Sequence, residues 1–299
     1  MVLSIRQQSP YSRDLLLVEL ERALTQLLHS QDGEPALSAA SSYYIFPAGK
    51  RIRPLLALLT CADLGGDVQQ LMAPAASLEL LHAASLIHDD LPSLDNDDFR
   101  RGRETCHKKF GEALAVLAGD NLIALASRNI ARCEIDPEIR LQLLSASNSA
   151  FMQLCAGQVL DLDHKPAEQA RVHRLKTGAL FGAACEFAAL VSRLEAAAVS
   201  ACRELGQELG ILFQIVDDAV DRYGNDQDRG RPGSSDTRNQ RLSFFSGQVD
   251  GSAALKHSAT HVERKIAAVE SAVRGCYLRG VRDIRAEILA HAESMKLPL

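Results

Sequence analysis

Two acidic motifs, each following an apolar run, are the residues of this sequence best suited to chemistry. They are Asp89-Asp90-Leu-Pro-Ser-Leu-Asp95 and Asp217-Asp218-Ala-Val-Asp221. Adjacent carboxylates repel each other, and the C-terminal end of a helix is unfavourable for anions. A hard divalent cation removes this penalty, because Mg²⁺ prefers carboxylate oxygens and commonly binds one or two of them together with substrate phosphates. The two motifs therefore predict a magnesium site.

The spacing inside each motif allows its aspartates to converge. At about 100° per residue, Asp89 and Asp95 would point about 120° apart on a straight helix, but Pro92 ends or bends the helix between them. Asp217 and Asp221 are four residues apart, so they share a helix face about 6 Å apart along the axis. A solvated acidic helix end is the alternative for either motif alone, but two motifs after two apolar runs favour a shared metal site.

Compact groups of cations accompany the acidic motifs. They are Lys50, Arg51 and Arg53 after Gly49, the run Arg100-Arg101-Gly102-Arg103, and Lys176 beside Thr177. Arginine guanidinium groups match phosphate oxygens bidentately. Each group alone would more often be a solvated surface. Together with the aspartates they predict a site for two diphosphates, one held through Mg²⁺ and one held directly.

Composition excludes several other classes of protein. The 299 residues are 46% hydrophobic and 24% charged, and 33 Lys and Arg oppose 38 Asp and Glu, so the net charge of −5 offers no broad basic surface for nucleic acid. No apolar run reaches the roughly 18 residues of a membrane span, and the start does not resemble a signal peptide. Seven scattered cysteines without a C-x-x-C pair are expected to be reduced packing residues. We expect a cytoplasmic protein.

Long helices must position the motifs. The proline-free stretches 93–136 and 167–231 are rich in Ala, Leu and Glu, and no segment alternates β-branched residues with period two. The sequence predicts an all-α fold in one domain, residues 1–299, and a loop over the glycine-rich residues 224–251. The expected helices are 11–30, 36–46, 51–64, 69–92, 109–133, 137–157, 166–195, 197–223 and 254–295.

Five blocks of sequence resemble the trans-prenyl diphosphate synthases, the all-helical class I isoprenoid synthases. They are GKRIRP, LLHAASLIHDDLPSLDNDDFRRG, CHKKFGEALAVLAGD, KTGAL and GILFQIVDDAVD, in the family's order and spacing between about residues 45 and 223. A DDxxxxD motif alone is common by chance, but all the blocks in register are not. The resemblance implies a helical bundle around a central apolar cavity, and a homodimer.

The resemblance also implies a role for each matching residue. Asp89, Asp95 and Asp217 correspond to the ligands of about three Mg²⁺ ions, and Asp90, Asp218 and Asp221 support them. Isopentenyl diphosphate would contact Lys50, Arg53, His82 and Arg101, although a lone histidine is more often structural. The allylic diphosphate would contact Arg100, Lys176, Thr177, Gln214 and Arg231.

The activity implied is elongation of an allylic diphosphate by one C5 unit. Ionisation of the allylic C–O bond gives a cation, the double bond of isopentenyl diphosphate attacks it, and a proton is lost. No protein base stands out in the sequence, which fits the family's use of the released diphosphate. Dipoles of Thr177, Gln214 and nearby carbonyls would stabilise the cation.

Product length depends in this family on side chains shortly before the first aspartate. Farnesyl-producing bacterial members usually have an aromatic residue five positions before it, where this chain has Ala84, followed by Ser85. Small residues deepen the cavity by about the volume of a ring, so we expect geranylgeranyl diphosphate, with farnesyl diphosphate as the alternative. Leu81 and Leu78 would limit longer growth.

The chain departs from the family after the second motif. Arg231 and Arg241 stand where lysines are usual, and Phe244 stands at the position of the usual tyrosine. The positive charge is kept, but arginine is a planar fork and lysine a point donor. The substitutions therefore change the donor geometry with which the loop 224–251 would close over the diphosphate. A class I terpene synthase and a non-catalytic partner subunit are the remaining alternatives. The DDAVD motif and the GKRIRP block argue against the first, and six intact motif aspartates against the second.

Overall fold

The computed structural model describes residues 11–29, 34–162, 168–223, 251–273 and 275–294. These residues are almost entirely helical, which confirms the all-α prediction apart from one hairpin of two-residue strands. The elements are α1 (Arg13–His29), α2 (Pro35–Ser42), α3 (Ile52–Asp63), α4 (Val68–Asp89), β1 (Phe99–Arg100), β2 (Arg103–Glu104), α5 (Cys106–Phe110), α6 (Glu112–Ala131), α7 (Pro137–Leu162), α8 (Gln169–Val172), the π-helical turn η2 (His173–Gly178), α9 (Ala179–Val191), α10 (Ala196–Tyr223), α13 (Gly251–Ala272) and α14 (Arg279–Ser294). The predicted loop over 224–251 lies outside the described residues, except at Gly251.

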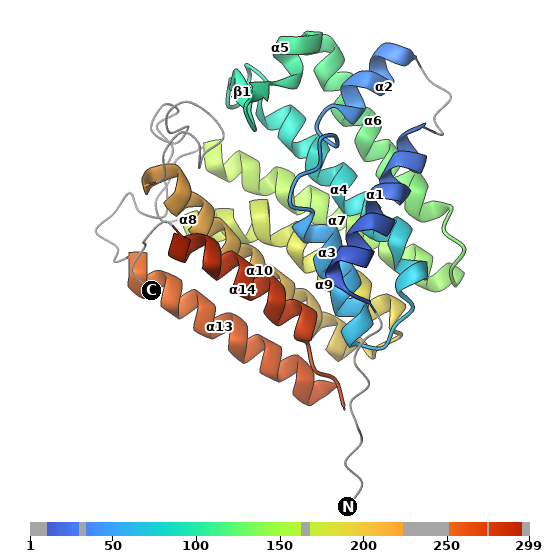
Figure 1. Ribbon diagram of the computed structural model, residues 1–299, viewed down its shortest axis with the longest axis vertical. Coiled ribbons are helices and arrows are strands. Elements are labelled where there is room, and N and C mark those ends of the chain that lie inside the picture. Colours follow the sequence, from blue (N-terminus) through green and yellow to red (C-terminus); the bar gives the residue numbers. More distant parts are fainter. Residues whose placement is uncertain (1–10, 30–33, 163–167, 224–250, 274, 295–299) are drawn as a thin grey trace, which may run out of the picture.

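The helices form a bundle in which α4 and α9 are internal (Figure 1). Helix α4 packs on α3, α6 and α9, while α9 packs on α3, α7 and α10. One hydrophobic cluster includes buried residues from α1 to α14. Helices α13 and α14 lie beside α10 at the edge of the bundle. No helix among the described residues has the length and apolar character needed to cross a membrane.

Three of the expected helices are wrong in extent because the chain turns within them. Residues 254–295 form α13 and α14, separated where Gly275 has φ +79°. Residues 109–133 are divided between α5 and α6 at Gly111, which has φ +88°. Both are left-handed backbone conformations that glycine adopts without steric cost and that end a helix. Residues 166–195 contain α8, η2 and α9, so a π-helical turn interrupts the expected α-helix.

The hairpin follows the first acidic motif. Strand β1 pairs antiparallel with β2, with Arg100 opposite Arg103. Arg101 and Gly102 between them both have positive φ, of 53° and 74°, as the two-residue turns that match strand twist require. Sequence analysis assigned no strand here, because two residues are too few to show alternation.

Close contact between backbones joins η2 and α9 to α10. A Cβ on Gly210 would lie 2.7 Å from the Cα of Gly178, and a Cβ on Gly206 would lie 2.2 Å from the Phe181 carbonyl oxygen. Larger residues at either position of α10 would separate the segments. The glycines therefore allow the helix that carries the second acidic motif to approach the turn that carries Lys176 and Thr177.

All seven cysteines are free thiols, as the sequence predicts. Five are buried, Cys276 is half-buried and Cys155 is exposed. Burial raises the pKa of Cys61 and of Cys202 to about 12, so these thiols are protonated at neutral pH. They pack as small apolar side chains.

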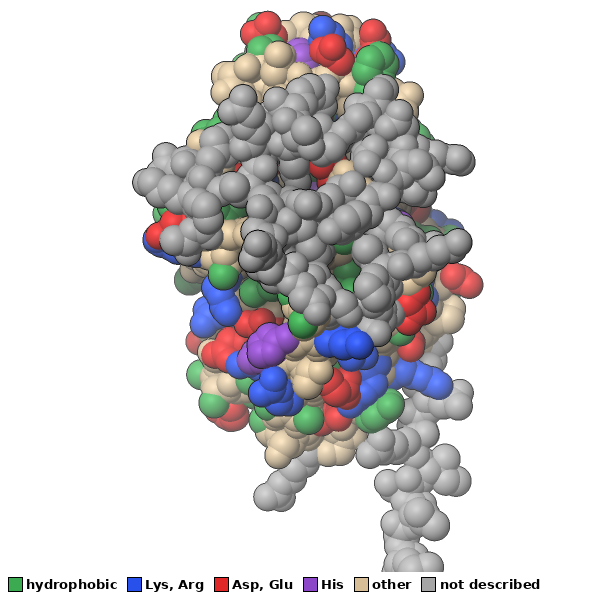
Figure 2. All heavy atoms as spheres, turned by 90° about the vertical axis from the view of Figure 1, so that its left-hand side faces the viewer, with side chains coloured by type: hydrophobic (Ala, Val, Ile, Leu, Met, Phe, Trp, Pro, Cys, Tyr) green, Lys and Arg blue, Asp and Glu red, His purple; other side chains and the backbone are tan. Residues whose placement is uncertain are grey.

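Charges of both signs are mixed on the described part of the face in Figure 2. Helix α13, which lies on this side of the bundle, carries Lys256, Glu263 and Lys265 together with His257 and His261. Alternating signs create no extended positive field of the kind that holds a nucleic-acid backbone.

We expect the stability of the protein to depend on pH through Asp63, at the end of α3. Its carboxylate accepts a hydrogen bond of 2.7 Å from the Gly280 amide of α14. Burial raises the pKa of Asp63 to about 7, although that hydrogen bond acts in the opposite direction. Because the pKa is raised on folding, the contribution to stability is complete below the ordinary carboxyl range and is lost as pH rises through about 7.

Denaturant unfolding between pH 4 and pH 8 measures this dependence. Asp63→Asn keeps an oxygen acceptor but cannot ionise, so its free energy of unfolding should fall less over this range than that of the unmodified protein. The exposed Glu134→Gln should keep the original profile. Parallel profiles for Asp63→Asn and the unmodified protein would contradict the assignment.

Candidate active site

A cavity of about 790 Å³ lies between the C-terminal part of α4 and the C-terminal half of α10. Most of the site residues expected from the sequence line it. They are Lys50, Arg53, His82, Ser85, Asp89, Asp95, Arg100, Arg101, Lys176, Thr177, Gln214, Asp217, Asp218 and Asp221. The expected residues Asp90, Ala84 and Leu81 are buried without lining the cavity. Arg231, Arg241 and Phe244 lie outside the described residues.

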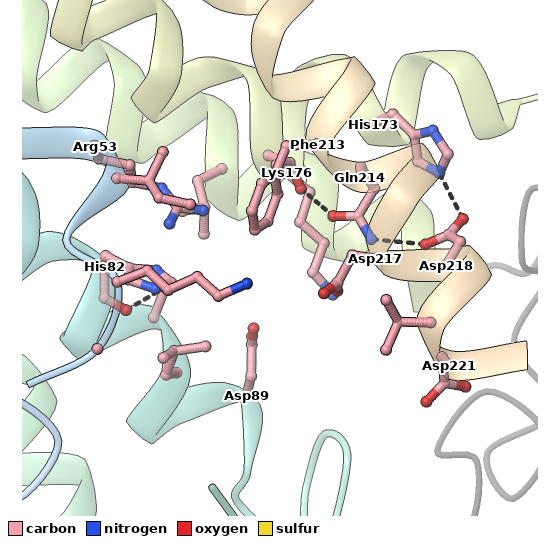
Figure 3. A pocket seen from close by; sticks show the side chains of 18 of the residues that line it. Arg53, His82, Asp89, His173, Lys176, Phe213, Gln214, Asp217, Asp218 and Asp221 are labelled. Carbon is pink, nitrogen blue, oxygen red and sulfur yellow. Dashed lines mark hydrogen bonds and ion pairs between the residues drawn. The ribbon is translucent and has the colours of Figure 1, made fainter. Parts of the chain in front are cut away.

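The two acidic motifs face each other across the cavity. Figure 3 shows Asp89 at the end of α4 pointing toward the side of the cavity where α10 carries Asp217. The Asp95 amide donates a 2.8 Å hydrogen bond to the Asp89 carbonyl oxygen, which folds the chain back after the helix. Helix α4 ends at Asp89, before Pro92, so the expected break inside the motif is present. Three carboxylates thus border one cavity from two walls.

These carboxylates fit magnesium that is shared with phosphate. Among the described residues, no three His, Cys, Asp or Glu side chains are close enough to hold a metal ion by themselves. Mg²⁺ commonly binds through one or two carboxylates and completes its coordination with water and substrate phosphates. Asp89, Asp95 and Asp217 supply oxygen donors on opposite walls, so a diphosphate between them would complete the donor set.

Asp90 does not face the cavity. Its side chain is fully buried and accepts hydrogen bonds from Arg100, with Nε at 2.9 Å and Nη2 at 2.7 Å. The Tyr44 hydroxyl donates to Asp90 Oδ2, which also accepts from Arg100 Nε. Asp90 and the neighbouring Asp89 therefore have different environments: Asp89 borders the cavity and Asp90 orients Arg100.

The wall formed by α3 and the middle of α4 is positively charged. The Nε atom of Arg53 is buried and has no hydrogen-bond partner, and the guanidinium lies 4.9 Å from the centre of the Phe181 ring. Burial lowers the pKa of Arg53 to about 10. Burial, and then the charge of Arg53, lower the pKa of His82 well below its ordinary value, so the imidazole is neutral at pH 7. These groups are arranged for a bound anion.

Arg51 has a different role from its neighbours in the GKRIRP block. Its guanidinium is buried and forms ion pairs with Glu79 at 2.6 Å and with Glu21 at 2.7 Å, and it donates to the Ile45 carbonyl oxygen. It connects α1, α4 and the segment before α3. Sequence analysis counted it with the diphosphate cations, because partners 28 and 30 residues away are not visible in a local motif.

The π-helical turn η2 places a second polar group beside the second motif. The Thr177 hydroxyl donates to the side-chain oxygen Oε1 of Gln214, and the side-chain Nε2 of Gln214 donates to Asp218 at 2.7 Å (Figure 3). His173 lies 3.4 Å from the other oxygen of Asp218. Single π-helical turns inside helices are frequent at functional sites, because they redirect side chains.

Sequence analysis missed Asp161 and His173. Lys176 pairs with Asp161 of α7 at 2.8 Å, and both residues border the cavity. The signals available were the spacing of His173 three residues before Lys176, and a lone aspartate after the apolar residues of α7. Neither signal identifies the partner of the residue, which is Lys176 for Asp161 and Asp218 for His173.

The residues expected to limit product length divide into two groups. Ser85 borders the cavity, while Ala84 and Leu81 are buried in α4 behind that surface. Apolar side chains on the described part of the chain also contribute to the lining of the cavity. They include Leu86, Leu154 and Phe213.

Known proteins share this sequence and fold. The polyprenyl synthetase family model matches residues 34–270. The farnesyl diphosphate synthase of Geobacillus stearothermophilus is 37% identical over 235 residues, which are 75% of this chain and 79% of that protein. The geranylgeranyl diphosphate synthase of Rhodobacter capsulatus is 38% identical over 230 residues, 74% of this chain and 78% of that protein.

A solved structure has the same fold. The crystal structure of a geranyltransferase from Helicobacter pylori, complexed with magnesium and isoprenyl diphosphate, matches with a TM-score of 0.79 at 24% identity, covering 96% of this chain and 100% of that one. At this identity the likeness shows the arrangement of helices. With the family match over residues 34–270, it completes the argument from motifs to fold: this chain belongs to the polyprenyl synthetase family.

Proposed function

We propose that the protein condenses isopentenyl diphosphate with an allylic diphosphate to give geranylgeranyl diphosphate. It is a prenyltransferase of its family, a short-chain trans-prenyl diphosphate synthase. The observation that carries the proposal is that one cavity has Asp89, Asp95 and Asp217 on facing sides and buried cations along another part of its lining. Two diphosphates with different modes of binding match these two parts of the cavity.

The basic wall would hold isopentenyl diphosphate. Arg53 and Arg101 both border the cavity, and burial lowers the pKa of each. A diphosphate would compensate the mutual repulsion of these cations, and the neutral His82 imidazole adds a hydrogen-bonding group without further positive charge. Lys50, exposed at the edge, completes the set.

The acidic walls would hold the allylic diphosphate through magnesium. Magnesium bound to Asp89, Asp95 and Asp217 would neutralise the leaving diphosphate, as Lewis acids do for phosphoryl oxygens. Arg100 and Lys176, oriented by Asp90 and Asp161, would donate to the same group. These contacts strengthen as negative charge develops on the leaving oxygen, so they favour ionisation.

The hydroxyl of Thr177 and the amide of Gln214 would stabilise the allylic cation. Both border the cavity and are joined by a hydrogen bond, and Gln214 is held by Asp218. Fixed dipoles stabilise a developing charge without the reorganisation that water would need. In this proposal the released diphosphate accepts the proton, as the family resemblance implies.

The C20 product is supported by the small residues of α4. Ser85 borders the cavity and Ala84 lies beside it in the chain, so α4 contributes no aromatic ring at these two positions. Farnesyl diphosphate is the second candidate, because relatives of similar identity carry both product names. Product length depends on the volume of the cavity near the growing chain, and overall sequence identity does not determine that volume.

We expect Ala84→Tyr to shorten the product from C20 to C15. The added ring occupies volume beside the end of the apolar cavity, so a growing chain meets it one C5 unit earlier. Ser85→Tyr, at the residue that directly borders the cavity, should shorten the product at least as much. Mass analysis of the dephosphorylated alcohols measures the change. Unchanged products from both variants would place the limit elsewhere.

Incubation with Mg²⁺, isopentenyl diphosphate and one allylic primer tests the function. The primers are dimethylallyl, geranyl and farnesyl diphosphate, and the alcohols are identified by mass after dephosphorylation. Geranylgeraniol as the end product supports the proposal. Farnesol as the only product would support prenyl transfer but show that the product is farnesyl diphosphate, not geranylgeranyl diphosphate. Absence of elongation from every primer, in the presence of Mg²⁺, contradicts the proposed function.

We also propose a homodimer, supported by the surface of α7. No charged residue occurs between Leu141 and Leu160 of this helix, and its exposed apolar side chains include Leu141, Met152 and Val159, exposed by 66%, 72% and 62%. Val116 and Leu117 on the neighbouring α6 are also exposed. Such patches on one chain are typical of protein interfaces. Sedimentation of the protein at micromolar concentration measures its mass directly.

A further inference from the structure

Tyr44 connects its own segment before α3 with the end of α4, both of which border the cavity, and with the start of α5; it does not line the cavity itself. It lies between α2 and α3, six residues before Lys50, and is only 8% exposed. Its hydroxyl donates to Asp90 at the end of α4 and accepts a 3.1 Å hydrogen bond from the Cys106 amide at the start of α5. The Tyr44 hydroxyl therefore both donates and accepts a hydrogen bond where these segments meet.

The position of Asp90 in turn determines the position of the Arg100 guanidinium. Its carboxylate is fully buried, and it binds the Nε and Nη2 atoms of Arg100 at 2.7–2.9 Å. A guanidinium has five N–H donors in a rigid fork, so its Nη1 side stays available for a second anion. Arg100 borders the cavity with 21% of its side chain exposed. The direction of that free side depends on where Asp90 is fixed.

Asp90 needs the tyrosine, since Arg100 alone does not define its position. Arg100 binds both oxygens of Asp90 but can move together with the carboxylate, whereas the Tyr44 hydroxyl adds a bond to Oδ2 from a third segment and restrains the pair. Without the hydroxyl, a buried carboxylate oxygen loses a partner, and so does the Cys106 amide. Arg100 would then present its free donors over a wider range of directions.

We propose that Tyr44 is a positioning residue for the allylic diphosphate, acting through Asp90 and Arg100. The proposal rests on the function proposed above and adds to it a residue that does not contact substrate.

The neighbouring Tyr43 offers a matched control. It is equally buried at 8%, and its hydroxyl donates a 3.0 Å hydrogen bond to the Glu104 carbonyl oxygen, away from Asp90. Its ring lies under Arg103, 4.1 Å from the guanidinium carbon. Tyr43→Phe thus removes one phenol hydroxyl from the same segment without changing the partners of Asp90.

The test compares Tyr44→Phe with Tyr43→Phe in steady-state kinetics. We expect Tyr44→Phe to raise the KM for the allylic diphosphate about tenfold, as loss of a hydrogen bond to a charged group does. The KM for isopentenyl diphosphate should stay within about twofold, and Tyr43→Phe should change neither. Inhibition by inorganic pyrophosphate, a probe that does not react, should weaken in Tyr44→Phe alone.

A double variant separates positioning from general destabilisation. If Tyr44 acts through Arg100, then Tyr44→Phe should have little further effect on the allylic KM in an Arg100→Lys background. Additive effects would overturn the proposal. An equal rise of both KM values in Tyr44→Phe would also overturn it, because a loosened scaffold affects both substrates.

Two further outcomes are distinguishable. Absence of prenyl transfer by the unmodified protein contradicts the proposed function, not the hydrogen bonds of Tyr44. If Tyr44→Phe does not fold, incorporation of 3-fluorotyrosine at position 44 keeps the ring and changes only the strength of the hydroxyl as a donor. An allylic KM that differs from that of the unmodified protein supports the proposal, and an identical one overturns it.

Discussion

Replacing Asp217 with asparagine is expected to lower kcat for prenyl transfer by about 10³-fold, with little effect on folding. Asp217 is exposed on α10 and faces the cavity from the wall opposite Asp89. Asparagine keeps one oxygen donor but removes the charge that would hold Mg²⁺ against the leaving diphosphate. Loss of one electrostatic contact to a developing charge costs about 10²–10³ in rate, and weakened metal binding adds to that loss.

Glu204→Gln provides the control on the same helix. Glu204 lies outside the cavity, where it forms a 2.8 Å surface ion pair with Lys265. Its removal should leave kcat unchanged, because exposed pairs contribute little to stability and this one does not approach the site. Raising the Mg²⁺ concentration should recover part of the activity of Asp217→Asn. Full activity of Asp217→Asn at ordinary Mg²⁺ would exclude Asp217 as a ligand.

Arg51→Met is expected to lower the free energy of unfolding by about 3–5 kcal/mol, the usual cost of removing one partner from a buried ion pair. Arg51 is 2% exposed, and Glu79, which it binds, is 4% exposed. Methionine fills much of the space but leaves two carboxylates and the Ile45 carbonyl oxygen without their donor. Denaturant unfolding, monitored by helical circular dichroism, measures the loss.

The double variant Arg51→Met with Glu79→Gln tests the cause. Once Glu79 is neutral, the missing arginine leaves less uncompensated charge, so the double variant should be more stable than the sum of the single losses predicts. Lys265→Met breaks only a surface pair and should have little effect on unfolding. If Lys265→Met and Arg51→Met cost the same, the buried ion pairs of Arg51 do not carry the stability assigned to them.

Local periodicity predicted most of the fold because helices are stabilised by residues three and four apart. The same rule placed Gln214, Asp217 and Asp221 on one face of a helix, and these residues all border the cavity. Glycine-dependent breaks such as the one at Gly275 were missed, since glycine inside an apolar pattern is also tolerated in helices.

Roles that depend on distant partners were not available from the sequence. Asp89 and Asp90 are adjacent, yet one borders the cavity and the other is fully buried. Asp90 is paired with Arg100 and with Tyr44, which lies 46 residues away. Arg51 and Arg53 are likewise two residues apart, but within the described part of the chain an ion pair with a carboxylate is seen for Arg51, with partners in α1 and α4, and not for Arg53. The spacing within a motif predicts which side chains lie close together, whereas tertiary contacts determine the role of each one.

The close backbone contact of α10 with η2 and α9 has a consequence for how this enzyme class diversifies. Gly178 and Gly210 let main chain meet main chain, so the distance between Lys176 and the aspartates of α10 is set by backbone contacts that substitutions away from these glycines leave in place. Ser85 and Ala84 lie on another helix, α4. If these residues limit product length, as proposed above, mutation can remodel the room for the growing hydrocarbon while the groups proposed to ionise the substrate keep their geometry. Such a separation lets new products evolve through single steps, each passing through an active catalyst.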